Sequence, residues 1–180
     1  EPQRATFLTL VAASALYDAV SLFVPKKFVK ELTVKWPNDL YAGDRKIAGI
    51  LTEMESKTDH VQWVVVGIGI DLNAESSDFS PEVQKIASSL KILTGSEINR
   101  PEAAACLINA FEKRYTSFLE NGSREVRQFV EEHSYLTGRR IRCDGVSGRA
   151  TGLSEEGYLL VQTDSGQIQK ILAGDITVEN

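Results

Sequence analysis

The polar residues best suited to chemistry gather in one stretch of the chain, residues 35–73. Lys-Trp-Pro-Asn-Asp-Leu occupies 35–40, Arg-Lys-Ile-Ala-Gly-Ile-Leu occupies 45–51, and Val-Val-Val-Gly-Ile-Gly-Ile-Asp occupies 64–71. Lys35 and Lys46 can each present a flexible ammonium group to an anion such as a phosphate or a carboxylate. The stretch therefore favours an anion-binding site, although either lysine taken alone is more simply interpreted as a solvent-exposed hairpin residue.

The other polar residues and glycines of this stretch have two interpretations each. Asn38 and Asp39 follow a proline and can serve as plain turn formers. Gly67 and Gly69 look like part of a phosphate loop, but neither a third glycine nor a following helix is present, which excludes that motif. Glycines inside an apolar strand instead mark a bulge or a place where a ligand approaches the backbone. Because His60 lies at a turn and no serine or cysteine lies beside a base, a nucleophilic triad is not expected.

Three short strands would position these residues. The apolar pattern and the turn residues predict strands at 32–36, 46–55 and 61–70, with turns at 37–39, 42–44 and 57–59. Pro37 lacks an N–H group, which suits the end of a strand better than its middle. Short turns imply an antiparallel meander, and its strand ends bring together five polar residues. These are Lys35, Asn38, Asp39, Lys46 and Asp71.

The rest of the chain is expected to form helices and then short strands. Helical spacing and end signals predict helices at 6–24, 81–93, 101–121 and 124–132. From Thr137 onward the sequence pattern changes, and glycines separate short apolar segments. The expected strands lie at 140–143, 147–153, 158–163, 167–172 and 176–179. Five short strands at this spacing, without a helix, are typical of a small SH3-like barrel.

Composition limits the class of protein. The chain has 180 residues, 42% apolar and 25% charged, with a net charge of -5. An acidic chain is not expected to bind nucleic acid, and no apolar run is long enough to span a membrane. Cys106 and Cys143 show no metal-ligand spacing, so a reduced, cytoplasmic setting is the expectation. The chain begins Glu-Pro-Gln without a methionine, which suggests a piece of a longer protein.

Taken together, the three central segments resemble the biotin protein ligase family, also called biotin-[acetyl-CoA-carboxylase] ligase. The resemblance continues through Ala-Ser-Ser-Leu at 87–90, Gly95, the helix after Arg100 and the terminal strands. It implies an α+β fold in which a mixed or antiparallel sheet packs with helices, as in class II synthetases. Residues 1–136 would form the catalytic domain and residues 137–180 an SH3-like barrel domain.

The activity that the resemblance implies has two steps. Family members join biotin to ATP, which gives biotinyl-5'-adenylate and pyrophosphate, and then transfer biotin to a lysine of a biotin carboxyl carrier domain of acetyl-CoA carboxylase. ATP and biotin are therefore expected as substrates and Mg²⁺ as cofactor. A homodimer is left open, and neither a membrane nor a nucleic acid is an expected partner.

The resemblance also assigns roles to residues of this chain. Lys46 would contact biotin and the phosphoryl oxygen of the adenylate, and Lys35 would contact phosphate. Asn38 and Asp39 would bind ATP and magnesium, and Asp39 would also orient or deprotonate the acceptor lysine. The remaining positions would contact biotin, at Gly49 and Gly67, or the adenine pocket, at Ser88 and Ser89.

The sequence departs from the family in two ways. Asp71 stands where most relatives have asparagine, and a carboxylate beside phosphates either repels them or recruits a metal ion. The family's Gly-Arg-Gly-Arg loop lies upstream of the first helix of this chain, so these 180 residues alone are expected to bind biotin and ATP weakly and to have little ligase activity. The alternative is a non-catalytic module of the same fold that senses biotin or its adenylate and pairs through its sheet. Octanoyltransferases share the core architecture but need a cysteine nucleophile, for which neither cysteine lies in a suitable motif.

Overall fold

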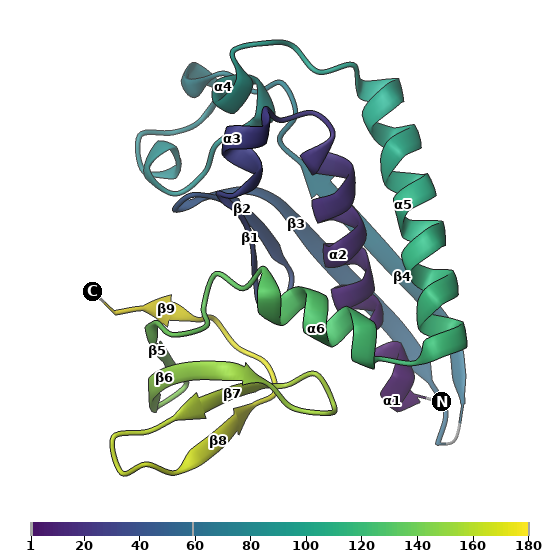
Figure 1. Ribbon diagram of the computed structural model, residues 1–180, viewed down its shortest axis with the longest axis vertical. Coiled ribbons are helices and arrows are strands. Elements are labelled where there is room, and N and C mark those ends of the chain that lie inside the picture. The colour runs from purple at the N-terminus through teal and green to yellow at the C-terminus, as the bar shows by residue number, and fades with distance from the viewer. Residues whose placement is uncertain (1, 59, 180) are drawn as a thin grey trace.

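A four-stranded antiparallel sheet carries the whole central stretch of the sequence. The computed structural model describes residues 2–58 and 60–179. The strands follow one another in the order β1-β2-β3-β4 (Figure 1). They are β1 (Leu32–Lys35), β2 (Asp39–Ala42), β3 (Arg45–Ser56) and β4 (Val61–Ile70).

Strand β2 corrects the expected three-stranded meander. The sequence predicts two turns at 37–39 and 42–44 with no strand between them, but Asp39–Ala42 pairs with β1 on one side and β3 on the other. Leu40 is buried and lies opposite Val34 and Ala48. Pairing on both sides satisfies the backbone groups of these four residues, although turn residues flank them at Pro37-Asn38 and Gly43-Asp44, so the neighbouring strands override the local signal.

Helices cover one face of this sheet. α2 (Leu8–Ser21) lies on the sheet beside α5 (Arg100–Asn121), as Figure 1 shows. The buried alanines of α2 let the helix lie close to the strands; they are Ala12, Ala13, Ala15 and Ala19. The helix expected at 6–24 is thus shorter, with the separate turns α1 (Pro2–Ala5) and α3 (Lys26–Val29) at its ends.

The prediction of a helix at 81–93 is wrong. The chain instead forms the 3-10 turns η1 (Ser76–Asp78) and η2 (Val83–Lys85), then the short helix α4 (Leu90–Thr94). Between η2 and α4 the backbone runs beside the start of β3: Lys46 N donates to Ile86 O at 2.8 Å, and Ser88 N donates to Lys46 O at 2.9 Å. These long-range bonds replace the helical ones that the local pattern indicates.

The helices expected at 101–121 and 124–132 are confirmed. The side chain of Asn99 accepts a hydrogen bond from Glu102 N at the start of α5, and Gly122 follows its last residue. α6 (Arg124–Glu132) buries Val126 and Val130 and crosses between the two sheets of the molecule (Figure 1). No helix within residues 2–58 and 60–179 is long and apolar enough to cross a membrane.

The C-terminal segment forms a second antiparallel sheet of five strands in the order β8-β7-β6-β5-β9. Ile141, Leu159 and Val161 fill its interior. The five expected strands are confirmed, some with shorter ends, and with them the α+β class. They are β5 (Arg140–Cys143), β6 (Val146–Leu153), β7 (Leu159–Gln162), β8 (Ile168–Ile171) and β9 (Thr177–Val178).

The two sheets are joined by buried contacts. The indole Nε1 of Trp36 donates to Gly157 O at 2.9 Å, so the end of β1 is bonded to the turn between β6 and β7. Gly157 has a φ of 83°, and a β-carbon there would lie 2.9 Å from the Phe7 ring. A glycine is therefore needed at this junction. The division of the chain at 136/137 into two domains stays a prediction.

Candidate functional site

One row of backbone neighbours crosses the central sheet at the candidate site. Lys35 lies opposite Asp39, Asp39 opposite Gly49, and Gly49 opposite Gly69. The adjacent row contains Val34, which is buried on the α2 side. Side chains alternate between the faces of a strand, so Lys35 and Asp39 point away from α2. The sheet thus presents these two charged groups on the face opposite the helices.

A β-bulge brings Lys46 to the same face. Leu40 pairs with Ala48 but Tyr41 pairs with Lys46, so Ile47 is an extra residue on β3. In a regular strand, Lys46 and Gly49 would point to opposite faces because they are three residues apart. A bulge re-aims the side chains on one side of it. Ile47 and Ala48 are accordingly both buried, and Lys46 extends over Gly49.

Lys46, Asp39 and Gly49 form the centre of the site. The ammonium Nζ of Lys46 lies 2.6 Å from Asp39 Oδ1, and the side chains are 42% and 17% exposed. A β-carbon on Gly49 would lie 3.0 Å from Cε and Nζ of Lys46 and 3.3 Å from Asp39 Oδ1. The absence of a side chain at Gly49 therefore leaves room for this ion pair against the bare backbone.

Lys35 is held beside the pair by an aromatic ring. Its Nζ lies over the ring of Tyr41, 5.5 Å from the centroid. A cation within about 6 Å of an aromatic centroid is attracted to the face of the ring. The structure therefore brings a second cation to the strand next to Asp39, as expected.

Asn38 is engaged by the backbone of β3. Its side-chain Nδ2 donates to Ile50 O at 2.7 Å, and Ile50 N donates to Asn38 O at 2.8 Å. This reciprocal pair fixes the turn between β1 and β2 against β3. The residue thus has a structural role beside the site, and its part in binding ATP or a metal stays a prediction.

Asp71 lies at the end of β4 close to the same cation. Asp71 N donates to Ile47 O at 2.9 Å, and Asp71 O accepts from Leu90 N at 2.9 Å. Burial raises the pKa of the Asp71 carboxyl above its ordinary value, and the positive charge of Lys46 opposes this shift. A second carboxyl group therefore lies within electrostatic range of Lys46, on a residue whose two backbone groups are both bonded.

Ser88 and Ser89 are both buried beside this edge of the sheet. Ser88 N donates to Lys46 O, which places the residue next to the site. The hydroxyl of Ser89 donates to Ala74 O at 2.6 Å and accepts from Ile92 N at 3.1 Å, so it caps α4. Contact of either serine with adenine stays a prediction.

Gly67 lies on the open face further along the sheet, opposite Leu51. The nearest atom to a β-carbon there is Leu51 O at 3.6 Å, an ordinary contact distance. The β3–β4 register runs unbroken from Ala48 to Glu55, so the bulge expected as one explanation of Gly67 and Gly69 is not formed there. The other explanation, close approach of a ligand, stays a prediction for Gly67.

The described residues contain no group of three or more histidine, cysteine or acidic side chains that could hold a metal ion. Mg²⁺ is commonly held by one or two carboxylates together with substrate phosphates. The carboxyl groups of Asp39 and Asp71, which both interact electrostatically with Lys46, fit that mode of binding. A metal held by protein side chains alone is not supported in this part of the chain.

The candidate site lies outside the cavity next to the C-terminal sheet. A cavity of about 270 Å³ lies between the start of α2, β3 and the C-terminal sheet. Residues lining it include Phe7, Trp36, Thr52 and Tyr158, but none of the candidate site residues. Thr52 Oγ1 accepts a hydrogen bond from Thr9 of α2, so the cavity lies on the helix side of the sheet. The assignment of the site therefore rests on its charges and its bare backbone.

Sequence reasoning missed two aromatic residues at the site. Tyr41 points to the same face as Asp39 because the two are separated by one residue of β2. That spacing would have revealed Tyr41 if β2 had been recognised as a strand. Tyr135 stacks on Tyr41 with ring centroids 4.7 Å apart, and no local pattern indicates this contact between residues so far apart in the chain.

Two family descriptions match the chain. Residues 1–71 match the "Biotin/lipoate A/B protein ligase family", and residues 138–178 match the "Biotin protein ligase C terminal domain". The first of these spans both biotin and lipoate enzymes, whereas the second is specific to biotin protein ligases.

Curated relatives and solved structures agree with both descriptions. The bifunctional ligase/repressor BirA of Bacillus subtilis is 34% identical over 97% of this chain and 53% of its own length. The biotin--[acetyl-CoA-carboxylase] ligase of Mycobacterium tuberculosis is 28% identical over 94% of this chain and 61% of its own length. The chain thus spans about half the length of the curated relatives that it matches.

The biotin protein ligase from Aquifex aeolicus, solved in complex with biotin and ATP, superposes with a TM-score of 0.79. It is 27% identical, and the match covers 97% of this chain and 71% of that one. Motifs, fold and both halves of the chain lead to the same assignment, and the chain belongs to the biotin protein ligase family.

Proposed function

We propose that the protein that carries this chain is an ATP-dependent biotin protein ligase, a biotin-[acetyl-CoA-carboxylase] ligase. It forms biotinyl-5'-adenylate and transfers the biotin to a lysine of a biotin carboxyl carrier domain. The chain spans about half of its curated relatives, so the activity is proposed for the protein in which the chain works. The observation that carries the proposal is the Lys46–Asp39 pair over bare Gly49, with Lys35 one strand away.

Adenylation needs cations at the position of this pair. The biotin carboxylate attacks the α-phosphorus of ATP, a C–O–P linkage forms, and pyrophosphate leaves with the electrons of the broken P–O bond. Two anions must approach each other while negative charge grows on the phosphoryl oxygens. Lys46 neutralises the carboxylate and the phosphoryl oxygen, and Lys35 contacts the phosphates. Gly49 and Gly67 allow the biotin rings to lie against the sheet.

The transfer step needs a base. An acceptor lysine must lose its proton before its amine can attack the carbonyl of the adenylate, and AMP then leaves. Asp39 is the proposed group that orients or deprotonates this amine, because its carboxylate lies at the centre of the site. When the acceptor lysine enters, its positive charge takes the place that Lys46 has beside Asp39.

The nucleotide side of the site includes four further residues. Asn38 and Asp39 are the proposed protein ligands of Mg²⁺, which neutralises phosphate charge when it is bound. Asp71 faces the same region, and Ser88 and Ser89 are proposed to lie near the adenine.

The partners and the setting of the protein are part of the same proposal. The acceptor is the biotin carboxyl carrier domain of acetyl-CoA carboxylase, the protein works in the cytoplasm, and a homodimer is compatible with the fold. Residues 1–136 act as the catalytic domain and residues 137–180 as a separate C-terminal domain.

The experiment is ATP-dependent transfer of biotin to a purified carrier domain. The wild-type protein is compared with Lys46→Ala and with Lys113→Ala, a matched control on the exposed side of α5. We expect Lys46→Ala to lower the transfer rate by roughly 100-fold or more, as for loss of one group that stabilises transition-state charge, and Lys113→Ala to leave it unchanged. Full transfer by Lys46→Ala would refute the assignment. Binding of biotin without transfer by the wild type would instead identify the non-catalytic module.

A further inference from the structure

Four side chains form a continuous stack beside the candidate site. The Tyr41 and Tyr135 rings have centroids 4.7 Å apart at an interplanar angle of 31°. The Arg139 guanidinium carbon lies 4.0 Å from the centroid of Tyr135, and Lys35 Nζ lies 5.5 Å from that of Tyr41. Two rings so close together leave no room for a cation between them, so the cations lie on the outer faces. The order is therefore Lys35, Tyr41, Tyr135, Arg139.

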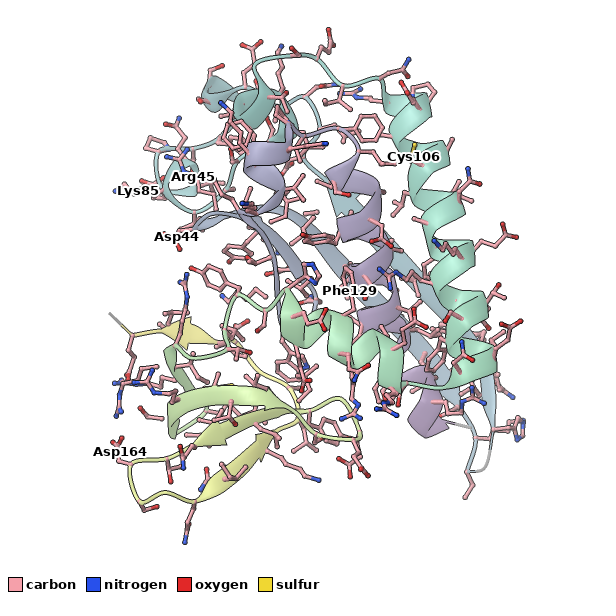
Figure 2. All side chains as sticks on the ribbon, viewed as in Figure 1. Asp44, Arg45, Lys85, Cys106, Phe129 and Asp164 are labelled. Atoms are coloured by element: carbon pink, nitrogen blue, oxygen red, sulfur yellow. The ribbon has the colours of Figure 1, made fainter. Side chains whose placement is uncertain are left out.

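The hydroxyl of Tyr135 reaches a second part of the site. It donates to Asp44 Oδ1 at 2.9 Å, and Arg139 Nη1 lies 3.4 Å from the same oxygen. Asp44 belongs to the turn between β2 and β3, where Figure 2 shows it next to Arg45. Lys46 is the following residue, so the turn that leads into Lys46 is bonded to Tyr135.

The backbone of Tyr135 is fixed on β1. Tyr135 N donates to Val34 O at 2.9 Å, and Val34 N donates to His133 O at 2.7 Å. The segment after α6 thus runs alongside the strand that carries Lys35. Tyr135 therefore has a fixed backbone. Its ring contacts Tyr41, which lies against Lys35, and its hydroxyl is bonded to Asp44, two residues before Lys46.

We infer that Tyr135 is a positioning residue for both site lysines: its ring holds Lys35 through Tyr41, and its hydroxyl holds Lys46 through Asp44. Its importance for catalysis rests on the proposed function, whereas its effect on the lysine positions does not. Arg139 covers the outer face of the stack, so the start of the C-terminal sheet is connected to the site through the same residue.

The first test measures lysine positions without any activity. The lysines are converted to their ¹³C-dimethyl forms, and each resonance is assigned by a lysine-to-arginine change. A group over an aromatic ring has a ring-current shift, so Lys35 should resonate upfield of an exposed lysine such as Lys113. We expect Tyr41→Leu to remove this shift and Tyr135→Leu to change both the Lys35 and the Lys46 resonances. Tyr135→Phe should change the Lys46 resonance and leave the Lys35 resonance unchanged.

A matched control removes a tyrosine elsewhere. Tyr115 stacks on Phe111 in α5, and Tyr115→Leu should leave both lysine resonances unchanged. Tyr135→Phe keeps the ring and its packing, so the inference remains testable if Tyr135→Leu does not fold. Unchanged Lys35 and Lys46 resonances in folded Tyr135→Leu, or an unchanged Lys46 resonance in Tyr135→Phe, would overturn the inference.

The second test uses the adenylation and transfer steps. Misplacement of catalytic groups by a fraction of an ångström to 1 Å is costly, so we expect Tyr135→Leu to lower kcat for adenylation about tenfold. Tyr135→Phe should have a smaller effect in the same direction. If the Tyr135 variants change the lysine resonances but the wild-type protein transfers no biotin, the proposed function is overturned and the positioning role is supported. Wild-type kinetics in folded Tyr135→Leu would overturn the positioning role alone.

Discussion

The ammonium of Lys46 lies 2.6 Å from Asp39 Oδ1, against the bare backbone of Gly49. This relationship depends on the bulge at Ile47, which turns Lys46 to the face of Gly49. Asp39 is the ion-pair partner of Lys46, so a substrate carboxylate or phosphate that binds Lys46 must share or replace this contact. Substitutions at or beside this pair can therefore distinguish effects on substrate binding, on catalysis and on stability.

Gly49→Ala tests the need for bare backbone under the pair. The new methyl group would lie 3.0 Å from Cε and Nζ of Lys46, which must move because it is the flexible end of a side chain. We expect adenylation to fall by roughly tenfold to 100-fold because a catalytic cation is misplaced, with little loss of thermal stability. Kinetics and a melting curve on the same preparation measure both effects.

The control for this prediction is Gly67→Ala on the same face. A methyl group there meets only Leu51 O at 3.6 Å, so the Lys46 dimethyl-lysine resonance should stay in place. An unmoved Lys46 resonance in Gly49→Ala as well would contradict the explanation.

Asp39→Asn separates the two half-reactions. The amide is nearly isosteric with the carboxylate but cannot accept a proton from an acceptor lysine. We expect transfer from preformed adenylate to fall by roughly 100-fold, and adenylation to fall less. Because Lys46 is 42% exposed, the stability change should stay within about 1 kcal/mol. Equal losses in the two half-reactions would remove Asp39 from its role as base.

Asp71→Asn tests the effect of burial on a carboxyl group. The pKa of Asp71 is raised in the folded protein, chiefly by burial. The folded state therefore binds this proton more tightly than the unfolded state, and the favourable contribution to stability is present below the unfolded pKa and is lost as pH rises through the folded pKa. Chemical unfolding across pH 3 to 8 should show Asp71→Asn more stable than wild type at neutral pH.

The advantage of Asp71→Asn should shrink as the pH falls, because the wild-type carboxyl group then becomes protonated. A stability difference that is independent of pH would show that the charge of Asp71 is not responsible.

Trp36→Phe tests the junction between the two sheets. The substitution keeps an aromatic ring but removes the buried hydrogen bond from Nε1 to Gly157 O. Leaving a buried carbonyl unpaired should cost about 1–3 kcal/mol of unfolding free energy. Trp63→Phe is the matched control, since Trp63 is 47% exposed and donates to a surface carboxylate, Glu55. Equal effects of the two substitutions in denaturant titrations would argue against a structural role for the junction.

Local signals predicted much of this fold because they agree with the long-range packing. The helix expected at 101–121 is one such case: the side chain of Asn99 caps its start, and Gly122 follows its end. The C-terminal strands are similarly separated by glycines in tight turns. Where the sequence misled, tertiary pairing overrode local preference: Asp39–Ala42 became a strand between two others, and residues 86–88 bonded to Lys46 instead of forming a helix.

The sequence indicates which candidate residues lie close together but does not determine their geometry. The motif placed Lys35, Asp39 and Lys46 close together, and the structure confirms this: Lys35 pairs with Asp39, and Lys46 Nζ lies 2.6 Å from Asp39 Oδ1. The bulge that turns Lys46 toward Gly49 depends on which residues pair across β2 and β3, and a single strand pattern does not determine that pairing. The contact of Tyr135 with Tyr41 is beyond local reasoning, since the two residues lie far apart in the sequence.

The most direct test of the central assignment is biotin-dependent exchange of pyrophosphate into ATP, which reports adenylate formation without a carrier protein. The wild-type protein and the Lys113→Ala control should exchange at the same rate, and Lys46→Ala should exchange at least roughly 100-fold more slowly. Exchange by Lys46→Ala at the wild-type rate would contradict the assignment of adenylation to the Lys46–Asp39 pair.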